Sequence, residues 1–169
     1  MTGAVLTLDI RNTDDALARL LEAASDLKPA LKNIGVELER STKERIAREE
    51  SPDGSHFAPL NPLYAKTKKG PGILRGESGD LANIVWQLAG DDTVEVGTNA
   101  IYGAIHQFGG VIKARNAAAL FFSMGGESFT VDNVTIPARP FLGLSKQDEE
   151  EVLAIVADHF QQAAGRALE

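Results

Sequence analysis

Three histidines, His56, His106 and His159, have the widest chemical repertoire in this chain of 169 residues. No two of them stand at a metal-ligand spacing, and none lies in the HExxH arrangement of a zinc protease. The chain has no cysteine, which removes disulfides, thiol catalysis and cysteine-ligated metal. Glycine patterns of nucleotide-binding loops are also missing. We therefore expect neither a metal nor a cofactor.

His106 is the histidine that its neighbours in the sequence hold most firmly, because Tyr102 precedes it by one helical turn and a glycine pair follows it. A histidine base needs a nucleophile and an orienting partner. Ser123 and Asp132 are candidates, but no GxSxG elbow surrounds Ser123. We therefore expect His106 and Gln107 to bond backbone groups of neighbouring loops. A hydrolase that uses His106 stays open as an alternative function.

The first of two dense segments, residues 94–110 (VEVGTNAIYGAIHQFGG), contains His106. Its residues 101–108 predict a short helix that ends at Gly109 and Gly110, since a glycine pair stops a helix readily. The helix carries Tyr102, His106, Gln107 and Phe108.

The second dense segment, residues 136–145 (IPARPFLGLS), is a stiff arm in which Arg139 stands between two prolines and close to Phe141. One interpretation is an interface anchor, since arginine and aromatic residues dominate binding hot spots and proline reduces the entropy lost on binding. The other is an internal brace, with Phe141 in the core and Arg139 paired with a carboxylate. The brace is favoured for Phe141, and both interpretations of Arg139 stay open.

Charge is distributed unevenly along the chain, whose formal net charge is −7. Residues 40–76 hold eight basic and four acidic residues, a balance of +4, and the remainder carries −11. Such polarity suits contact with acidic neighbours or with other copies of the chain. A solvated helix face followed by a lysine-rich loop explains it equally well. A nucleic-acid-binding adaptor that uses residues 40–76 is a further alternative, which the net charge disfavours.

The periodicity of the chain predicts one α+β domain spanning residues 1–169, a mostly antiparallel sheet packed against N-terminal and C-terminal helices, with a long basic loop. The expected elements, in chain order, are a strand at 5–10, a helix that breaks at 28–29, a helix from 29 to about 50, a loop at 51–80, a hairpin of 81–89 with 93–98, strands at 111–115 and 118–124 around a turn at 115–116, a strand at 128–136, and a last helix from 145. We expect Ser145 and Asp148 to form a capping box there.

Two of these elements carry specific expectations. The charged half of the second helix, residues 39–50, is expected to bury little. The loop at 51–80 is expected to be mobile in the monomer and ordered on assembly. No apolar run approaches the roughly 20 residues of a membrane helix, so no membrane partner is expected.

The two dense segments, in this order, resemble the tailed-bacteriophage virion morphogenesis family, the tail-completion proteins of Mu-like and P2-like phages. The SPDG turn at 51–54, the PL pair at 59–60 and GDL at 79–81 fit the same pattern, so that the resemblance spans residues 51–145. It implies a structural protein without enzymatic activity. Such a protein completes the head-proximal end of the tail and supports head–tail joining, as a ring that is a hexamer by analogy.

The partners that the resemblance implies are other copies of the chain, tail tube or tail terminator proteins, and head connector proteins. Direct contact with DNA is not expected. Assembly would take place in the host bacterial cytoplasm, with the protein in the tail or neck of the virion, and a transient scaffold stays open. The residues expected at the assembly interface are Tyr102, His106, Gln107, Phe108, Arg139, Phe141, Lys66, Lys68 and Lys69.

Overall fold

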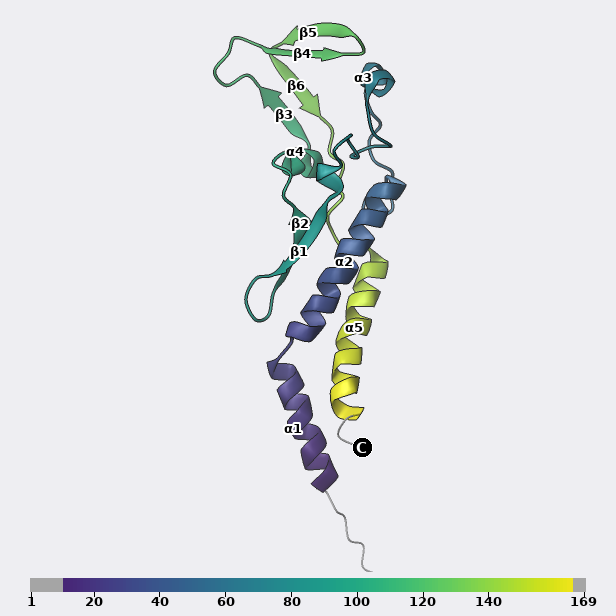
Figure 1. The fold of residues 1–169 in the computed structure, drawn as a ribbon, viewed down its shortest axis with the longest axis vertical. Helices are drawn as coiled ribbons and strands as arrows, with labels where there is room; N and C mark the ends of the chain where they lie inside the picture. Colours follow the sequence, from purple (N-terminus) through teal and green to yellow (C-terminus); the bar gives the residue numbers. More distant parts are fainter. Residues whose placement is uncertain (1–10, 166–169) are drawn as a thin grey trace, which may run out of the picture.

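The structure, a computed structural model, describes residues 11–165, with side chains from residue 17 onward (Figure 1). The strand predicted at residues 5–10 lies outside this range. The helices are α1 (Arg11–Ser25), α2 (Lys28–Arg48), α3 (Pro62–Thr67), the 3₁₀ turn η1 (Asp80–Ala82), α4 (Gly103–Phe108) and α5 (Lys146–Gly165). The strands are β1 (Ile84–Leu88), β2 (Val94–Thr98), β3 (Gly110–Lys113), β4 (Leu120–Met124), β5 (Glu127–Val131) and β6 (Asn133–Ile136). The predicted α+β class is confirmed.

Three long helices form one end of an elongated molecule, with α5 lying beside both α1 and α2 (Figure 1). Pro29 occupies the first turn of α2, where a missing N–H costs nothing, and this explains the break after α1. The β1–β2 hairpin packs on α2. A Cβ atom at Gly35 would lie 2.6 Å from the ring of Trp86, so the absence of a side chain at Gly35 sets how closely hairpin and helix approach.

One face of the C-terminal half of α2 is buried, contrary to the expectation from its charge. Ile46 is fully buried, and Thr42 and Arg45 are only 4% and 3% exposed. The prediction failed because these residues continue the apolar stripe of the helix at helical spacing, and the polar members of the stripe find partners inside the fold. The main hydrophobic core comprises Ile46, Phe57, Leu74, Leu81, Ile84 and Phe141.

Arg45 forms a buried ion pair with Asp148, the third residue of α5. Its Nη1 donates to the carbonyl oxygens of Phe141 and Gly143, both at 3.0 Å. Ser41, one turn earlier on α2, donates its hydroxyl to the other carboxylate oxygen of Asp148. One guanidinium therefore joins α2, the arm that contains Phe141, and the start of α5.

The predicted capping box at the start of α5 is confirmed. The backbone N–H of Asp148 donates to Ser145 Oγ at 3.1 Å, and Asp148 Oδ2 accepts from the backbone N–H of Ser145 at 2.8 Å. Burial alone would raise the pKa of Asp148. The hydrogen bonds from Ser41 and Ser145, together with the charge of Arg45, lower it below its ordinary value.

The strands form three separate two-stranded antiparallel sheets rather than one sheet. The predicted hairpin of β1 and β2 is confirmed, with Trp86 opposite Val96. The predicted pairing around residues 115–116 is wrong, because β3 pairs with β6 and β4 pairs with β5. Gly125 and Gly126 both have positive φ, which favours a tight two-residue turn between β4 and β5. The strand expected at 128–136 is accordingly divided at Asp132.

The segment 51–80 contains helix α3, which was not expected, and two members of the core. Phe57 and Leu74 are 5% and 8% exposed, so this segment is anchored on either side of α3. Its mobility before assembly stays a prediction. Among the helices of residues 11–165, none has the length and hydropathy needed to cross a membrane.

We expect Asp148→Asn to lower the free energy of unfolding by about 3 kcal/mol, because it leaves the buried Arg45 charge without a counterion. Urea denaturation at pH 7 measures this. The folded pKa of Asp148 is depressed, so its contribution is present above the unfolded value of about 3.9 and is lost as the pH falls through the folded pKa. The variant should therefore show a flatter loss of stability in acid.

The matched control is Glu44→Gln, which breaks the exposed ion pair with Arg40 on the same helix. Exposed pairs contribute less than about 1 kcal/mol, so this variant should unfold nearly as wild type does. Equal losses in the two variants would show that the buried pair contributes no special stability.

Candidate functional site

Gln107 of α4 clamps the arm that follows β6. Its Oε1 accepts the backbone N–H groups of Phe141 and Leu142, both at 3.0 Å, and its Nε2 donates to the carbonyl oxygen of Leu142 at 2.9 Å. The expectation that Gln107 bonds backbone groups of a neighbouring loop is confirmed. Gly109 closes the same junction, because a Cβ there would lie 2.7 Å from the backbone nitrogen of Ala138.

Arg139 and Phe141 both act as internal braces. Phe141 is completely buried in the core, and Arg139 is 6% exposed. Arg139 donates Nε–H to the carbonyl of Ala58 at 2.6 Å and Nη2–H to that of Pro59 at 2.8 Å, so its partners are carbonyl groups and not the carboxylate that the brace interpretation included. A contact of these two residues with another subunit stays a prediction, and in this structure they hold the segment after Phe57 in place.

His106 packs its ring edge-on against Tyr102, with ring centroids 6.0 Å apart. Its Nδ1 is buried and has no hydrogen-bond partner among the described residues, so the backbone bond expected of its side chain is not formed. Burial, and then the charge of Arg139, lower the pKa of His106. The hydroxyl of Ser123 pairs with Ser128 on β5, and no hydrogen bond joins it to His106. The His106 hydrolase therefore gains no support.

Around α4, three large apolar or aromatic side chains face solvent. Ile101 is 100% exposed, Phe108 79% and Tyr102 42%. We name these three residues the α4 patch. Beside it lies a cavity of about 410 Å³, which Ala100, Phe141 and Leu142 also line. Contiguous exposed apolar surface of this kind is typical of protein–protein contacts.

The three lysines expected at the interface differ in their surroundings. Lys66, in the last turn of α3, is exposed, and Lys69 is exposed and lies 3.6 Å from the carboxylate of Glu77. Lys68 Nζ donates to the carbonyl groups of Lys69, Gly70 and Arg75, at 3.2, 2.9 and 2.6 Å. Lys68 therefore stabilises its own loop, and only the other two lysines are available to a partner without loss of these bonds.

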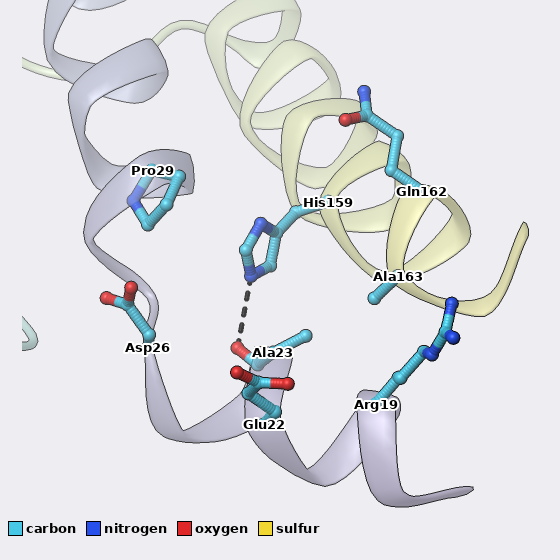
Figure 2. A pocket seen from close by; sticks show the side chains of 8 residues that line it. All are labelled: Arg19, Glu22, Ala23, Asp26, Pro29, His159, Gln162 and Ala163. Atoms are coloured by element: carbon cyan, nitrogen blue, oxygen red, sulfur yellow. Dashed lines mark hydrogen bonds between the residues drawn. The ribbon is translucent and has the colours of Figure 1, made fainter. Parts of the chain in front are cut away.

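A cavity lies between α1, the start of α2 and the end of α5 (Figure 2). It measures about 580 Å³, and His159 reaches into it to donate Nε2–H to the carbonyl of Ala23 at 3.0 Å. His159 is half-buried on α5. Within residues 11–165, no group of three His, Cys, Asp or Glu side chains could hold a metal ion.

Arg45 and Arg75 are important residues that the sequence interpretation counted only as charges. Arg45 lies four residues after Ser41, on the face that contains Ile34 and Ile46. This helical spacing was the signal that could have placed it inside. Arg75 lies in an irregular loop, and no sequence pattern points to its half-buried position.

The model of the phage virion morphogenesis family matches residues 8–161. The chain belongs to this family. The match covers both dense segments, all of α1 and α2, and α5 as far as residue 161.

Two relatives show the same likeness over nearly their whole length. The chain is 29% identical over 160 residues to the Mu-like prophage FluMu G protein 2 of Haemophilus influenzae, covering 93% of this chain and 97% of that protein. It is 26% identical over 152 residues to the putative capsid assembly protein G of Escherichia phage Mu, with 87% of each chain covered. No solved structure matches the chain significantly. As a member of the virion morphogenesis family, the protein has a structural role in phage assembly.

We expect Gln107→Leu to lower the free energy of unfolding by about 2–4 kcal/mol, because it leaves two partly buried N–H groups and one carbonyl group of the arm without partners. Amide hydrogen exchange should accelerate at Phe141 and Leu142 more than in α5. The matched control is Gln161→Leu, on the exposed face of α5, which should leave both stability and exchange nearly unchanged. Protection of Phe141 and Leu142 as in wild type would contradict the clamp.

Proposed function

We propose that this protein completes the head-proximal end of a phage tail and supports head–tail joining, as a ring of identical subunits without enzymatic activity. Its partners in this proposal are further copies of the chain, the tail tube or tail terminator, and the head connector. Assembly takes place in the host bacterial cytoplasm, and the protein remains in the tail or neck of the virion.

The family supports the assembly role, and the name of the phage Mu relative, a putative capsid assembly protein, suggests a place near the head. A position at the junction of tail and capsid agrees both with the resemblance to tail-completion proteins and with this name. The mechanism is differential binding, because each subunit must prefer a finished tail end to a free partner.

The observation that carries the proposal is the large accessible surface of the chain, 11755 Å². A compact monomer of 18.0 kDa exposes roughly 8,000 Å². The excess is of the order that obligate protein interfaces bury, about 2,000–5,000 Å². Three separate two-stranded sheets and an elongated outline make this surface, and neighbouring subunits would cover part of it (Figure 1).

Ring closure requires that two different patches meet on adjacent copies. The α4 patch supplies an apolar surface for one side of that contact, and Lys66 and Lys69 of the basic segment supply exposed positive charge. The rest of the chain carries an excess of carboxylates and offers complementary charge.

Deletion of the gene from its phage or prophage should yield filled heads beside separate tails, or tails with a defective end. Negative-stain electron microscopy of induced lysates measures this, and a plasmid copy of the gene should restore joined particles. Intact infectious particles from the deletion strain would overturn the proposed role at the tail end.

We expect Ile101→Asp and Phe108→Asp each to weaken self-association at least about tenfold, since a charge replaces an apolar contact at the centre of the interface. Sedimentation velocity over a concentration series measures the association. The double change Lys66→Glu with Lys69→Glu should weaken it less and in a salt-dependent way. Ala118→Asp, in an exposed loop, is the matched control.

All these residues are exposed or hold only surface ion pairs, so the thermal unfolding of each variant should match wild type. An unchanged association in both the Ile101 and the Phe108 variants would show that the α4 patch is not the contact between copies.

A further inference from the structure

A small cavity between the segment 60–76, η1, α4 and the arm is lined almost entirely by cationic, aromatic and apolar side chains. Its volume is about 250 Å³, below the range of about 300–1,000 Å³ typical of small-molecule pockets. The polar side chains around it are Lys68, Arg75, His106, Arg139, Tyr64 and Tyr102. None of the lining residues is acidic.

Arg139 is the most buried charge of this cavity. It is 6% exposed, and within residues 11–165 it forms no ion pair, since its two side-chain hydrogen bonds run to the carbonyl groups of Ala58 and Pro59. Burial lowers its pKa, as expected where no carboxylate compensates for the lost hydration. Buried charges are ordinarily paired, because an isolated one costs several kcal/mol. The described residues therefore supply no counterion to the guanidinium of Arg139.

Two further polar atoms at the cavity are buried without hydrogen-bond partners in the part of the chain that the structure describes, Arg75 Nε and His106 Nδ1. Such atoms are rare in native folds, and each needs an explanation. Two carboxylates lie at this loop. Glu77 is 3.6 Å from Lys69, Glu49 accepts the backbone N–H of Ile73 at 2.7 Å, and neither forms an ion pair with Arg75. One guanidinium without an ion pair and two buried polar atoms without hydrogen-bond partners thus belong to residues that line the same small cavity.

We propose that this cavity receives a carboxylate side chain from a neighbouring subunit of the assembled particle. A carboxylate accepts several hydrogen bonds at once and matches the fork of a guanidinium, and the volume suits one short side chain better than a larger ligand. The exposed rings of Tyr64 and Tyr102 form the rim through which it enters. The inference rests on the proposed assembly role, and it names the chemistry of one contact. The carboxylate has two possible sources, another copy of this chain or another virion protein.

The first test uses acetate as the probe, at constant ionic strength against chloride. The His106 ring signals in heteronuclear NMR should shift saturably with acetate, and the pKa of His106 should rise because a negative charge now lies beside it. The signals of His159, in the distant cavity between α1 and α5, are the internal control and should not move.

Arg75→Gln is the decisive variant. The substitution removes a guanidinium whose Nε forms no hydrogen bond among the described residues. The backbone carbonyl group of Arg75 remains and can still accept from Lys68, so the stability of the fold should be unchanged. Acetate affinity should fall about tenfold. The proposal would be overturned if acetate did not shift the His106 signals of the wild type, or if it shifted them equally strongly in Arg75→Gln.

The second test identifies the source. If Arg75→Gln weakens self-association of the purified chain, another copy supplies the carboxylate. If self-association is unchanged but the variant does not restore joined particles in the deletion strain, another virion protein supplies it. Acetate binding without either effect would mean an adventitious ion only and would overturn the assembly contact. Because acetate binding is measured on the isolated chain, failure of the ring proposal is distinguishable from failure of this one.

Discussion

The buried guanidinium of Arg45 is the interaction on which the rest of the described fold depends. It pairs with Asp148 at the start of α5 and binds the carbonyl groups of Phe141 and Gly143 at 3.0 Å. These bonds fix the crossing of α2 and α5 and the path of the arm between β6 and α5. Since the arm also brings Phe141 into the core, one charged side chain joins the helical part of the molecule to the hairpin part.

The hairpin part has little core of its own. The β1–β2 sheet packs on α2, and the arm that follows β6 is held by two clamps: Gln107 binds it from α4, and its own Arg139 binds the carbonyl groups of Ala58 and Pro59. Isolated hairpins are marginal in water, so such clamps must supply stability. The chain exposes more surface than a compact monomer of its mass, which agrees with the proposed assembly of several copies.

Both proposed contacts lie on the same region, where α4 meets the arm. The α4 patch offers apolar area, and the cationic cavity behind Tyr102 offers a specific place for one carboxylate. The α4 patch would contribute binding affinity, and the cationic cavity would fix the register of the two partners. This is the usual division between apolar and charged groups at interfaces. Among the described residues, His106 forms no hydrogen bond with a nucleophile or an orienting partner.

The sequence by itself determined the α+β class, the long helices, the β1–β2 hairpin, the capping box of Ser145 and Asp148, and the family, because periodicity, turn chemistry and motif order are local properties. Only the tertiary structure decided that Arg45 lies inside, that β3 pairs with β6, and that Arg139 binds carbonyl groups instead of a carboxylate. These outcomes depend on groups about 25 to 100 residues apart in the chain, and no local pattern of charge or hydropathy specifies which distant partner a side chain meets.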